Sequence, residues 1–510
     1  MPPLKVLLVS AEVSPYSKTG GLGDVAGSLP KALRAKGVDI RVVLPKISSI
    51  PQSRLEGLRH IATFNVHLSW RTQEAKIYTL DTPSTDSANS NPGAPAKTGT
   101  PVNTLCISGE TNATDKGEIY FIENDYYFNR SSLYGQEDDH ERFAFFTKAA
   151  IEMLNHIGFK ADIIHFNDWH SGLGPTYLRD IYSGFSFFSN MKSLYTIHNL
   201  HYQGEFGRPV LCDIGLNDGY FQSIEFHGNI SFMKAGILHS HAVSTVSQTY
   251  AKEITTEAYG YGMDGLLRKR DEEGRLFGIV NGIDTTTSNP ETDPALYTNF
   301  NKDNLNKKRE NKHQLQEALG LPISDAPMLS MITRLAEQKG LDIVALVMDE
   351  LMSLDIQLVI LGTGEPRYEN LFKHYAHHVP QKVSANINFD SNLSQKIYAA
   401  SDIFLMPSVY EPCGLGQLFA MRYGAIPIVR KTGGLADTVR HYNPEHNPTG
   451  NGFLFEDYVA SGLMWAIKEA LAIYNTPNWE PLVKSAMSGN FSWDNSAEEY
   501  IGLYNKIMQM

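Results

Sequence analysis

Short apolar runs alternate with longer helix-like segments along most of the chain. The apolar runs that have strand length lie at residues 5–9, 39–44, 162–165, 193–198 and 241–247, and again at 327–333, 357–362, 402–407 and 426–430. Runs that are apolar throughout are typical of parallel strands covered on both faces. The pattern therefore predicts an α/β protein with two doubly wound, Rossmann-like lobes.

The domain organisation follows from the gap between the two groups of runs. A chain of 510 residues is longer than one hydrophobic core usually supports. A polar stretch at 285–290 has the composition of a connector. We expect an N-terminal domain at 1–276, a C-terminal domain at 277–490 and a segment at 491–510 that crosses back to the first domain. Residues 82–101 lack periodicity and are expected to form a surface insertion.

Composition excludes several classes of protein. The chain is 42% hydrophobic and 20% charged, as in ordinary globular proteins, and its formal net charge is −12. An acidic chain is unsuited to sequence-independent binding of nucleic acid or of an anionic membrane. No apolar stretch has membrane-spanning length. Three widely spaced cysteines predict neither a disulfide framework nor a cysteine zinc site, which favours a reducing compartment.

One heptad occurs twice. Residues 18–24 read Lys-Thr-Gly-Gly-Leu-Gly-Asp, and residues 431–437 read Lys-Thr-Gly-Gly-Leu-Ala-Asp. Each copy follows an apolar run and opens a helix-like stretch, so glycine amides and the positive helix end could approach an anion. A Gly-Gly turn taken alone is more often structural. Because the first copy follows the opening strand of its lobe and the second follows a late strand, we interpret them as similar chemistry at non-equivalent places.

Two further motifs follow predicted strands in the second half. Arg334 and Lys339 lie just after the run 327–333, where open α/β sheets bind ligands, and together could neutralise a diphosphate. The alternative is a solvated basic loop. Glu411 follows the run 402–407 in a tight Pro-Cys-Gly turn and could act as an acceptor at the same crevice, or simply as a helix cap.

Histidine-rich motifs end two strands of the first half, at 165–170 and 198–204. They invite a metal-site interpretation, that of a metal-dependent hydrolase. The spacing matches no standard zinc pattern, however, and His, Asn, Asp, Trp, Tyr and Gln together also suit a sugar-binding surface. We favour sugar and expect no metal site.

With these motifs in place, the chain resembles the ADP-glucose-dependent glycogen and starch synthases, retaining glycosyltransferases of the GT-B fold. The resemblance runs from residue 5 to about 504, through the motifs at 18–22, 168–170, 196–200, 232–236, 259–263, 281–284, 334–340, 362–365, 411–415 and 432–439. It implies two Rossmann-like domains with a deep cleft between them. It also implies a cytoplasmic enzyme, or one in the plastid stroma if a transit peptide has been removed.

The resemblance also implies roles for individual residues. The catalytic residues would be His170, Arg334, Lys339 and Glu411. The donor would be bound by Lys18, Gly20, Gly21, Asp24, Asn281, Gly364, Phe389, Cys413, Gly414, Leu415, Thr432, Gly433 and Gly434. The acceptor would be bound by Asp168, His198, Asn199 and Tyr202.

The implied reaction is transfer of glucose from ADP-glucose to the non-reducing end of an α-1,4-glucan with retention of configuration. ADP-glucose and the glucan (glycogen, starch or maltooligosaccharide) are the expected partners, with no nucleic acid, membrane or cofactor involved. Two alternatives remain open. One is a GT-B transferase that uses UDP-glucose, and the other is a non-catalytic glucan-binding paralogue. The oligomeric state does not follow from the sequence.

Overall fold

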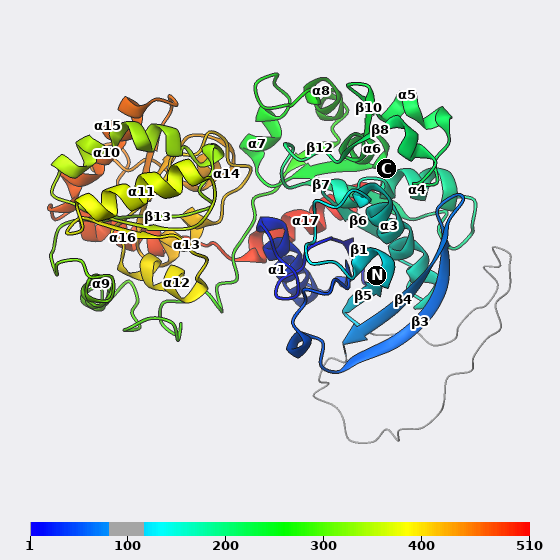
Figure 1. The fold of residues 1–510 in the computed structure, drawn as a ribbon, viewed down its shortest axis with the longest axis horizontal. Helices are drawn as coiled ribbons and strands as arrows, with labels where there is room; N and C mark the ends of the chain where they lie inside the picture. Colours follow the sequence, from blue (N-terminus) through cyan, green and yellow to red (C-terminus); the bar gives the residue numbers. More distant parts are fainter. Residues whose placement is uncertain (1, 81–116) are drawn as a thin grey trace. The chain divides into compact units, whose positions relative to one another are not determined.

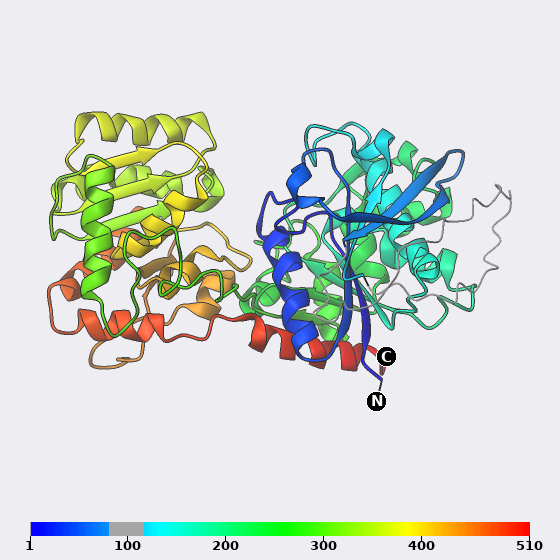
Figure 2. The ribbon, with the colours of Figure 1, turned by 90° about the horizontal axis from the view of Figure 1, so that it is seen from below.

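The computed structural model describes residues 2–80 and 117–510; the expected insertion at 82–101 lies outside the described residues. The chain forms two compact units, one made of residues 1–243 and 502–510 and the other of residues 244–501. Figure 1 shows a sheet with flanking helices in each unit, and Figure 2 shows the same elements from below. The predicted α/β class is confirmed.

A mixed nine-stranded sheet organises the first unit. Its order is β12-β11-β7-β6-β1-β2-β5-β4-β3, and β1 pairs in parallel with both β2 and β6. The division between the units falls inside β11. The strands are β1 (Lys5–Val9), β2 (Asp39–Pro45), β3 (Leu58–His67), β4 (Thr72–Leu80), β5 (Ile119–Glu123), β6 (Ile163–Asn167), β7 (Lys192–Ile197), β11 (Ala242–Thr245) and β12 (Leu276–Gly278).

A small antiparallel sheet and several helices complete this part of the chain. The small sheet has the order β8-β10-β9, from β8 (Glu205–Gly207), β9 (Glu225–Phe226) and β10 (Asn229–Ser231). The helices are α1 (Gly21–Ala35), α2 (Asp125–Phe128), α3 (Asp139–His156), α4 (Gly174–Tyr177), α5 (Phe221–Ile224) and α6 (Phe232–His239). Helix α3 is buried along most of its length, as expected for a helix packed on the centre of the unit.

The second unit is built on a parallel sheet with the order β15-β14-β13-β16-β17-β18. Its strands are β13 (Met328–Ile332), β14 (Gln357–Leu361), β15 (Val383–Asn386), β16 (Ile403–Met406), β17 (Ile426–Arg430) and β18 (Phe453–Phe455). A large cluster of buried apolar side chains from the strands and the surrounding helices forms its core. Every strand that the apolar runs predict, in both halves of the chain, is present.

The helices from residue 248 onward connect these strands and extend to the C-terminus. They are α7 (Gln248–Glu253), α8 (Asp264–Glu272), α9 (Asn306–Ala318), α10 (Leu341–Ser353), α11 (Pro366–His378), α12 (Ser391–Ala400), α13 (Gly416–Arg422), α14 (Gly433–Thr438), α15 (Ala460–Tyr474), α16 (Trp479–Met487) and α17 (Trp493–Ile507). Within the first unit, Tyr504 near the end of α17 contacts His165 of β6, with its hydroxyl 2.9 Å from Nδ1.

In each of the two large sheets, strands are added on both sides of the first parallel strand. From β1 the chain adds β2 on one side and later β6 on the other, and from β13 it adds β14 on one side and later β16 on the other. Open α/β sheets bind their ligands beyond the carboxyl ends of the strands at such a switch point. The topology therefore marks the residues after β1 and β6, and those after β13 and β16, as the places for a site.

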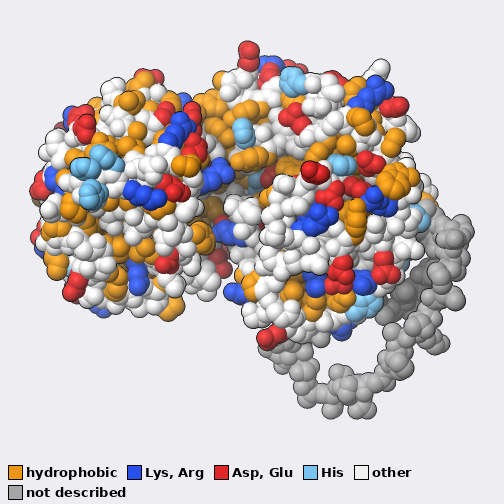
Figure 3. Space-filling view, in the orientation of Figure 1, with side chains coloured by type: hydrophobic (Ala, Val, Ile, Leu, Met, Phe, Trp, Pro, Cys, Tyr) orange, Lys and Arg blue, Asp and Glu red, His pale blue; other side chains and the backbone are white. Residues whose placement is uncertain are grey.

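The surface carries charges of both signs. On the face seen in Figure 3, acidic and basic side chains are interspersed, and neither sign dominates. Within residues 2–80 and 117–510, none of the helices is both long enough and apolar enough to cross a lipid bilayer.

Candidate functional site

The first copy of the repeated heptad closes around a carboxylate. Glu12, just beyond β1, is buried and accepts hydrogen bonds from the Thr19 amide (2.6 Å), the Thr19 hydroxyl (2.6 Å) and the Gly20 amide (3.0 Å). Tyr134 donates a further bond to Glu12 at 2.6 Å. This carboxylate holds the turn that leads into α1, whose positive N-terminus favours a negative charge.

Lys18 and Asp24 form an ion pair within the same turn. Lys18 Nζ lies 2.7 Å from Asp24 Oδ1, and both side chains are partly exposed. Burial raises the pKa of Asp24, and the Lys18 ammonium opposes that rise. Of the predicted donor residues in this unit, Lys18, Gly20, Gly21 and Asp24 are thus brought together at the N-terminus of α1.

Asp168 ties the end of β6 to the end of β7. Its Oδ1 accepts a hydrogen bond from the His198 amide at 2.7 Å. Its backbone φ is 54°, a left-handed conformation that is uncommon outside glycine and that clusters at functional sites. Burial is the main cause of a rise in the pKa of Asp168 to about 7, and the His198 and Asn199 amides oppose that rise.

His170 lies on the short turn that follows Asp168. Its ring stacks on Tyr134, with centroids 4.4 Å apart and planes 20° apart, and it packs against the edge of Phe143. Burial holds the pKa of His170 well below its usual range, so the ring is neutral. Its Nδ1 is buried and has no hydrogen-bond partner among the described residues.

The other candidate acceptor residues lie at the end of β7. His198 Nε2 donates to Asn167 Oδ1 at 2.9 Å, since the Asn167 amide nitrogen is committed to the carbonyls of Val9 and His165. Burial lowers the pKa of His198 to about 3, so this ring is neutral with an acceptor at Nδ1. Asn199 caps a tight turn by accepting from the His201 amide at 3.1 Å, and Tyr202 is exposed.

His165, the remaining histidine of this group, is part of the core. Its two ring nitrogens contact the hydroxyls of Tyr504 and Thr196, and burial lowers its pKa to about 3. Among the described residues, no group of three or more His, Cys, Asp and Glu side chains is placed to hold a metal ion. The histidines are thus divided between core packing and a polar surface.

In the second unit, Lys339 and Glu411 form a partly buried ion pair. Lys339 Nζ lies 2.7 Å from Glu411 Oε2, and the Ser408 hydroxyl donates to the same oxygen at 3.0 Å. Lys339 ends a short turn after β13, and Glu411 belongs to the loop after β16. Gly340 makes this approach possible, because its φ is 74° and a Cβ there would clash with the Pro407 carbonyl. Both residues lie at the switch point of the sheet.

Arg334 lies on the same loop and is exposed. Its guanidinium donates to Gln338 Oε1 at 3.2 Å, and Gln338 reaches back to the Tyr410 carbonyl. Gly364 lies beside this loop, where a Cβ would clash with the Leu335 carbonyl. Phe389, predicted to bind the donor, is 91% exposed on the loop between β15 and α12.

The second copy of the heptad also closes around a carboxylate. Glu253, at the end of α7, accepts from the Thr432 hydroxyl at 2.9 Å and from the Gly433 amide at 3.0 Å. The Gly434 amide donates to the carbonyls of Glu411 (3.1 Å) and Pro412 (3.2 Å). Both predicted phosphate-binding amides therefore already donate hydrogen bonds to protein oxygens in this structure. A phosphate would have to displace these acceptors.

The two glycines of this turn have a packing role that the sequence did not suggest. A Cβ on Gly433 would clash with the Glu411 carbonyl, and a Cβ on Gly434 would clash with the Cys413 carbonyl. The turn thus packs directly against the 411–413 loop and restricts the position of the Glu411 backbone. The absence of a side chain is required for this close approach.

Cys413, Gly414, Leu415 and Asn281 complete the second group. Burial raises the pKa of the Cys413 thiol to about 12, with Asn281 opposing that rise through hydrogen bonding, so the thiol is packed and not nucleophilic. Gly414 has a φ of 72°, and Leu415 precedes the first residue of α13. Asn281 Oδ1 is buried and has no hydrogen-bond partner within the described part of the chain.

The predicted residues therefore form two groups, one in each unit. Glu12, Tyr134, Gln338 and Glu253 are functional neighbours that sequence reasoning missed. Glu12 lies between the first strand and the heptad, which is a local signal. Glu253 is far from its partner in sequence, so no local pattern could have identified it.

Comparisons with known proteins agree for both halves of the chain. The family described as "Starch synthase catalytic domain" matches residues 5–269, and that described as "Glycosyl transferases group 1" matches residues 316–478. Glycogen synthase from Clostridium novyi is 46% identical over 99% of both chains. Glycogen synthase from Bacillus cereus strain Q1 is 43% identical over 99% of this chain and 100% of the relative.

Solved structures give the same result. The catalytic domain of starch synthase IV from Arabidopsis thaliana, bound to ADP and acarbose, is 33% identical, with a TM-score of 0.86 and coverage of 100% of both chains. Sucrose-phosphate synthase from Thermosynechococcus elongatus shares the fold, with a TM-score of 0.58 at 18% identity and coverage of 99% of both chains. The chain belongs to the family of glycogen and starch synthases, glucosyltransferases with the two-domain GT-B fold.

Proposed function

We propose that this glucosyltransferase takes glucose from ADP-glucose and adds it, with retention, to the 4-hydroxyl at the non-reducing end of an α-1,4-glucan. The observation that carries the proposal is the grouping of Arg334, Lys339 and Glu411 beyond β13 and β16. Two cations and one buried carboxylate at a switch point suit a ligand that has a diphosphate at one end and hydroxyls at the other.

The two cations would act on the leaving group. As the bond between glucose C1 and the diphosphate oxygen breaks, negative charge grows on ADP, and Arg334 and Lys339 stabilise it. Lys339 is paired with Glu411 in this structure. Donor binding then places the diphosphate beside Lys339 and the sugar hydroxyls beside Glu411. On this account the two side chains supply the charge, and no divalent cation or other cofactor is needed.

The first unit would contribute the sugar and acceptor contacts. His170 is neutral and has an unpaired buried Nδ1, which suits a sugar hydroxyl. The acceptor glucan would bind beside Asp168, His198, Asn199 and Tyr202. The similar starch synthase IV, solved with ADP and acarbose bound, supports ADP as the nucleotide and an oligosaccharide as the second ligand.

The chemical step proposed is a front-face displacement. The C1–O bond to ADP breaks with its electron pair leaving on the diphosphate, and the glucan 4-hydroxyl oxygen forms a new bond to C1 on the same face. The hydroxyl proton passes to the departing phosphate oxygen. A double displacement would need a nucleophile on the opposite face, and the thiol nearest to Glu411 in sequence, Cys413, is packed and held protonated by burial.

A donor-comparison assay tests the proposal. Purified protein is incubated with maltoheptaose and with ADP-glucose or UDP-glucose labelled in the glucose, and the label in the glucan is counted. We expect transfer from ADP-glucose that exceeds transfer from UDP-glucose by at least an order of magnitude. Preference for UDP-glucose would identify the alternative transferase, and no transfer from either donor would identify a non-catalytic paralogue.

A further inference from the structure

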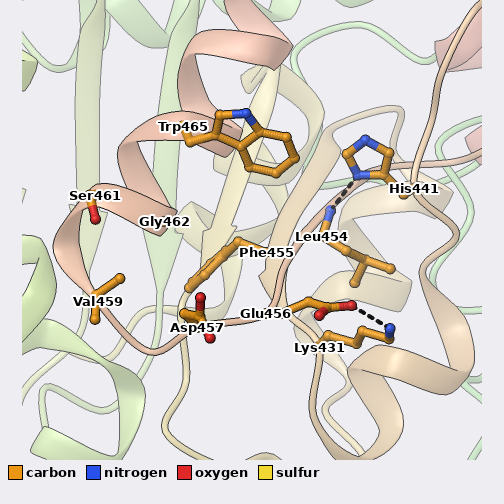
Figure 4. A pocket seen from close by; sticks show the side chains of 10 residues that line it. All are labelled: Lys431, His441, Leu454, Phe455, Glu456, Asp457, Val459, Ser461, Gly462 and Trp465. Carbon is orange, nitrogen blue, oxygen red and sulfur yellow. Dashed lines mark hydrogen bonds and ion pairs between the residues drawn. The ribbon is translucent and has the colours of Figure 1, made fainter.

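A pocket lies in the second unit and is lined by one residue of the second heptad, Lys431. It encloses about 530 Å³, within the range of roughly 300–1,000 Å³ typical of small-molecule sites. Strand β18 and the start of α15 form its walls (Figure 4). None of Arg334, Lys339 and Glu411 lines it. No step of the proposed reaction uses it.

Trp465 gives this pocket an exposed flat face that is held in place. Its side chain is 48% exposed, and its ring is stacked on His441 with centroids 5.8 Å and planes 8° apart. His441 is itself fixed, because its Nδ1 accepts from the Leu454 amide at 3.1 Å and its Nε2 lies 3.3 Å from Glu469 Oε2. The indole is therefore preorganised, which lowers the entropic cost of using it to bind a ligand.

Polar groups line the pocket around the indole. Glu456 is held by Lys431, with Nζ 2.6 Å from Oε1, and the ion pair lowers the pKa of that carboxyl. Asp457 and Ser461 are exposed, and among the described residues neither side chain has a hydrogen-bond partner. Figure 4 shows these side chains on the walls below Trp465. Two carboxylates and a hydroxyl beside an aromatic face favour a neutral ligand rich in hydroxyls and oppose a phosphate.

We propose that this pocket binds a segment of α-glucan at a second site, distinct from the place where glucose is transferred. The apolar C–H face of one glucose ring packs on Trp465, and its hydroxyls donate to Asp457 and Glu456. This inference rests on the proposed function for the identity of the polymer. A glucan polymer offers many segments to this pocket, whereas a short oligosaccharide offers one, so the pocket raises the affinity for polymer.

Binding of the full-length protein to glycogen tests the proposal without any need for turnover. In native gels that contain glycogen, wild-type protein should be retarded, and Trp465→Ala should lose most of that retardation. Asp457→Ala should weaken it as well, and this exposed side chain can be removed without leaving a buried group unpaired. Leu346→Ala is the matched control, because Leu346 is an exposed apolar side chain of the same unit outside the pocket.

Kinetics provide the second readout. Trp465→Ala should raise the KM for glycogen about tenfold, equivalent to ~1.4 kcal/mol, with unchanged kcat and an unchanged KM for maltotriose. Equal retardation and equal KM values for wild type and Trp465→Ala would overturn the inference and leave the proposed function standing. Retardation lost in Trp465→Ala, in a protein that transfers glucose from neither donor, would uphold this site and refute the proposed function. If Trp465→Ala loses self-association but keeps its binding to glycogen, the pocket binds a second copy of the chain and the inference is overturned.

Discussion

Lys339 Nζ lies 2.7 Å from Glu411 Oε2, although the two residues follow different strands of the second sheet. Glu411 is also bonded to Ser408 and is backed by the Gly433–Gly434 turn. Because Glu411 is buried, removing Lys339 leaves the Glu411 carboxylate uncompensated. The pair is thus a preorganised charge arrangement on which the proposed chemistry depends.

Replacing Lys339 tests its role at the leaving group. We expect Lys339→Ala to lower kcat by about a hundredfold to a thousandfold, because one preorganised contact to developing charge supplies about 3–4 kcal/mol. Steady-state kinetics with ADP-glucose measure this. Lys468→Ala is the control, since that lysine belongs to an exposed ion pair with Glu350 in the same unit. Turnover of Lys339→Ala close to that of the control would exclude the role.

We expect the Glu12 carboxylate to stabilise the turn formed by the first heptad. Glu12→Ala leaves the amides of Thr19 and Gly20 without their acceptor, and hydrogen bonds to a charged group are worth roughly 1.5–3 kcal/mol each. Hydrogen–deuterium exchange should therefore accelerate in peptides that cover residues 18–24. Glu74→Ala removes an exposed carboxylate of the same unit and should leave exchange there unchanged. Unaltered exchange in Glu12→Ala would show that the turn forms without this anchor.

Asp168 predicts a pH dependence of stability. Its pKa is about 7 in the folded protein against an ordinary value of 3.8, so between these values the folded state binds a proton that the unfolded state lacks. The contribution to stability is full below pH ~4 and is lost as pH rises toward 7. Asp168→Asn keeps the carbonyl acceptor for the His198 amide but cannot titrate. Thermal midpoints of the wild type, relative to this variant, should fall across that window; a constant difference would contradict the assignment.

The charge arrangement also predicts insensitivity to chelators. Because Arg334 and Lys339 are proposed to neutralise the departing diphosphate, EDTA should leave the initial rate of transfer unchanged. The rate is measured before and after chelation, and again after Mg²⁺, Mn²⁺ or Zn²⁺ is added back. A rate that EDTA abolishes and one of these ions restores would require a metal in the mechanism.

Most strands buried on both faces were predictable because their apolar runs are continuous, although the buried run of β5 was missed. The hairpin of β3 and β4 was missed, because β3 at the edge of the sheet is mostly exposed or half-buried and burial alternates along β4, so no such run results. Strand β18 has only three residues, which is too short for a pattern. Length and continuity of apolar sequence thus account for most of what could be predicted of the fold.

The sequence identified candidate site residues that follow strands, but it did not identify the side chains that hold those residues in place. Both heptads were expected to offer their amides to an anion. Instead Glu12 and Glu253 already occupy equivalent positions on the two turns, each bonded to the threonine hydroxyl and to the first glycine amide. Glu253 comes from α7, about 180 residues earlier in the chain, and only tertiary structure brings such partners together.

Transfer of glucose with retention of configuration is tested most directly by following the reaction of ADP-α-glucose with maltotriose by proton NMR. We expect ADP-glucose to be consumed while the anomeric signal of a new α-1,4 linkage grows in equal amount, with no β-linked product. A β-linked product, or release of free glucose without elongation of the glucan, would contradict it.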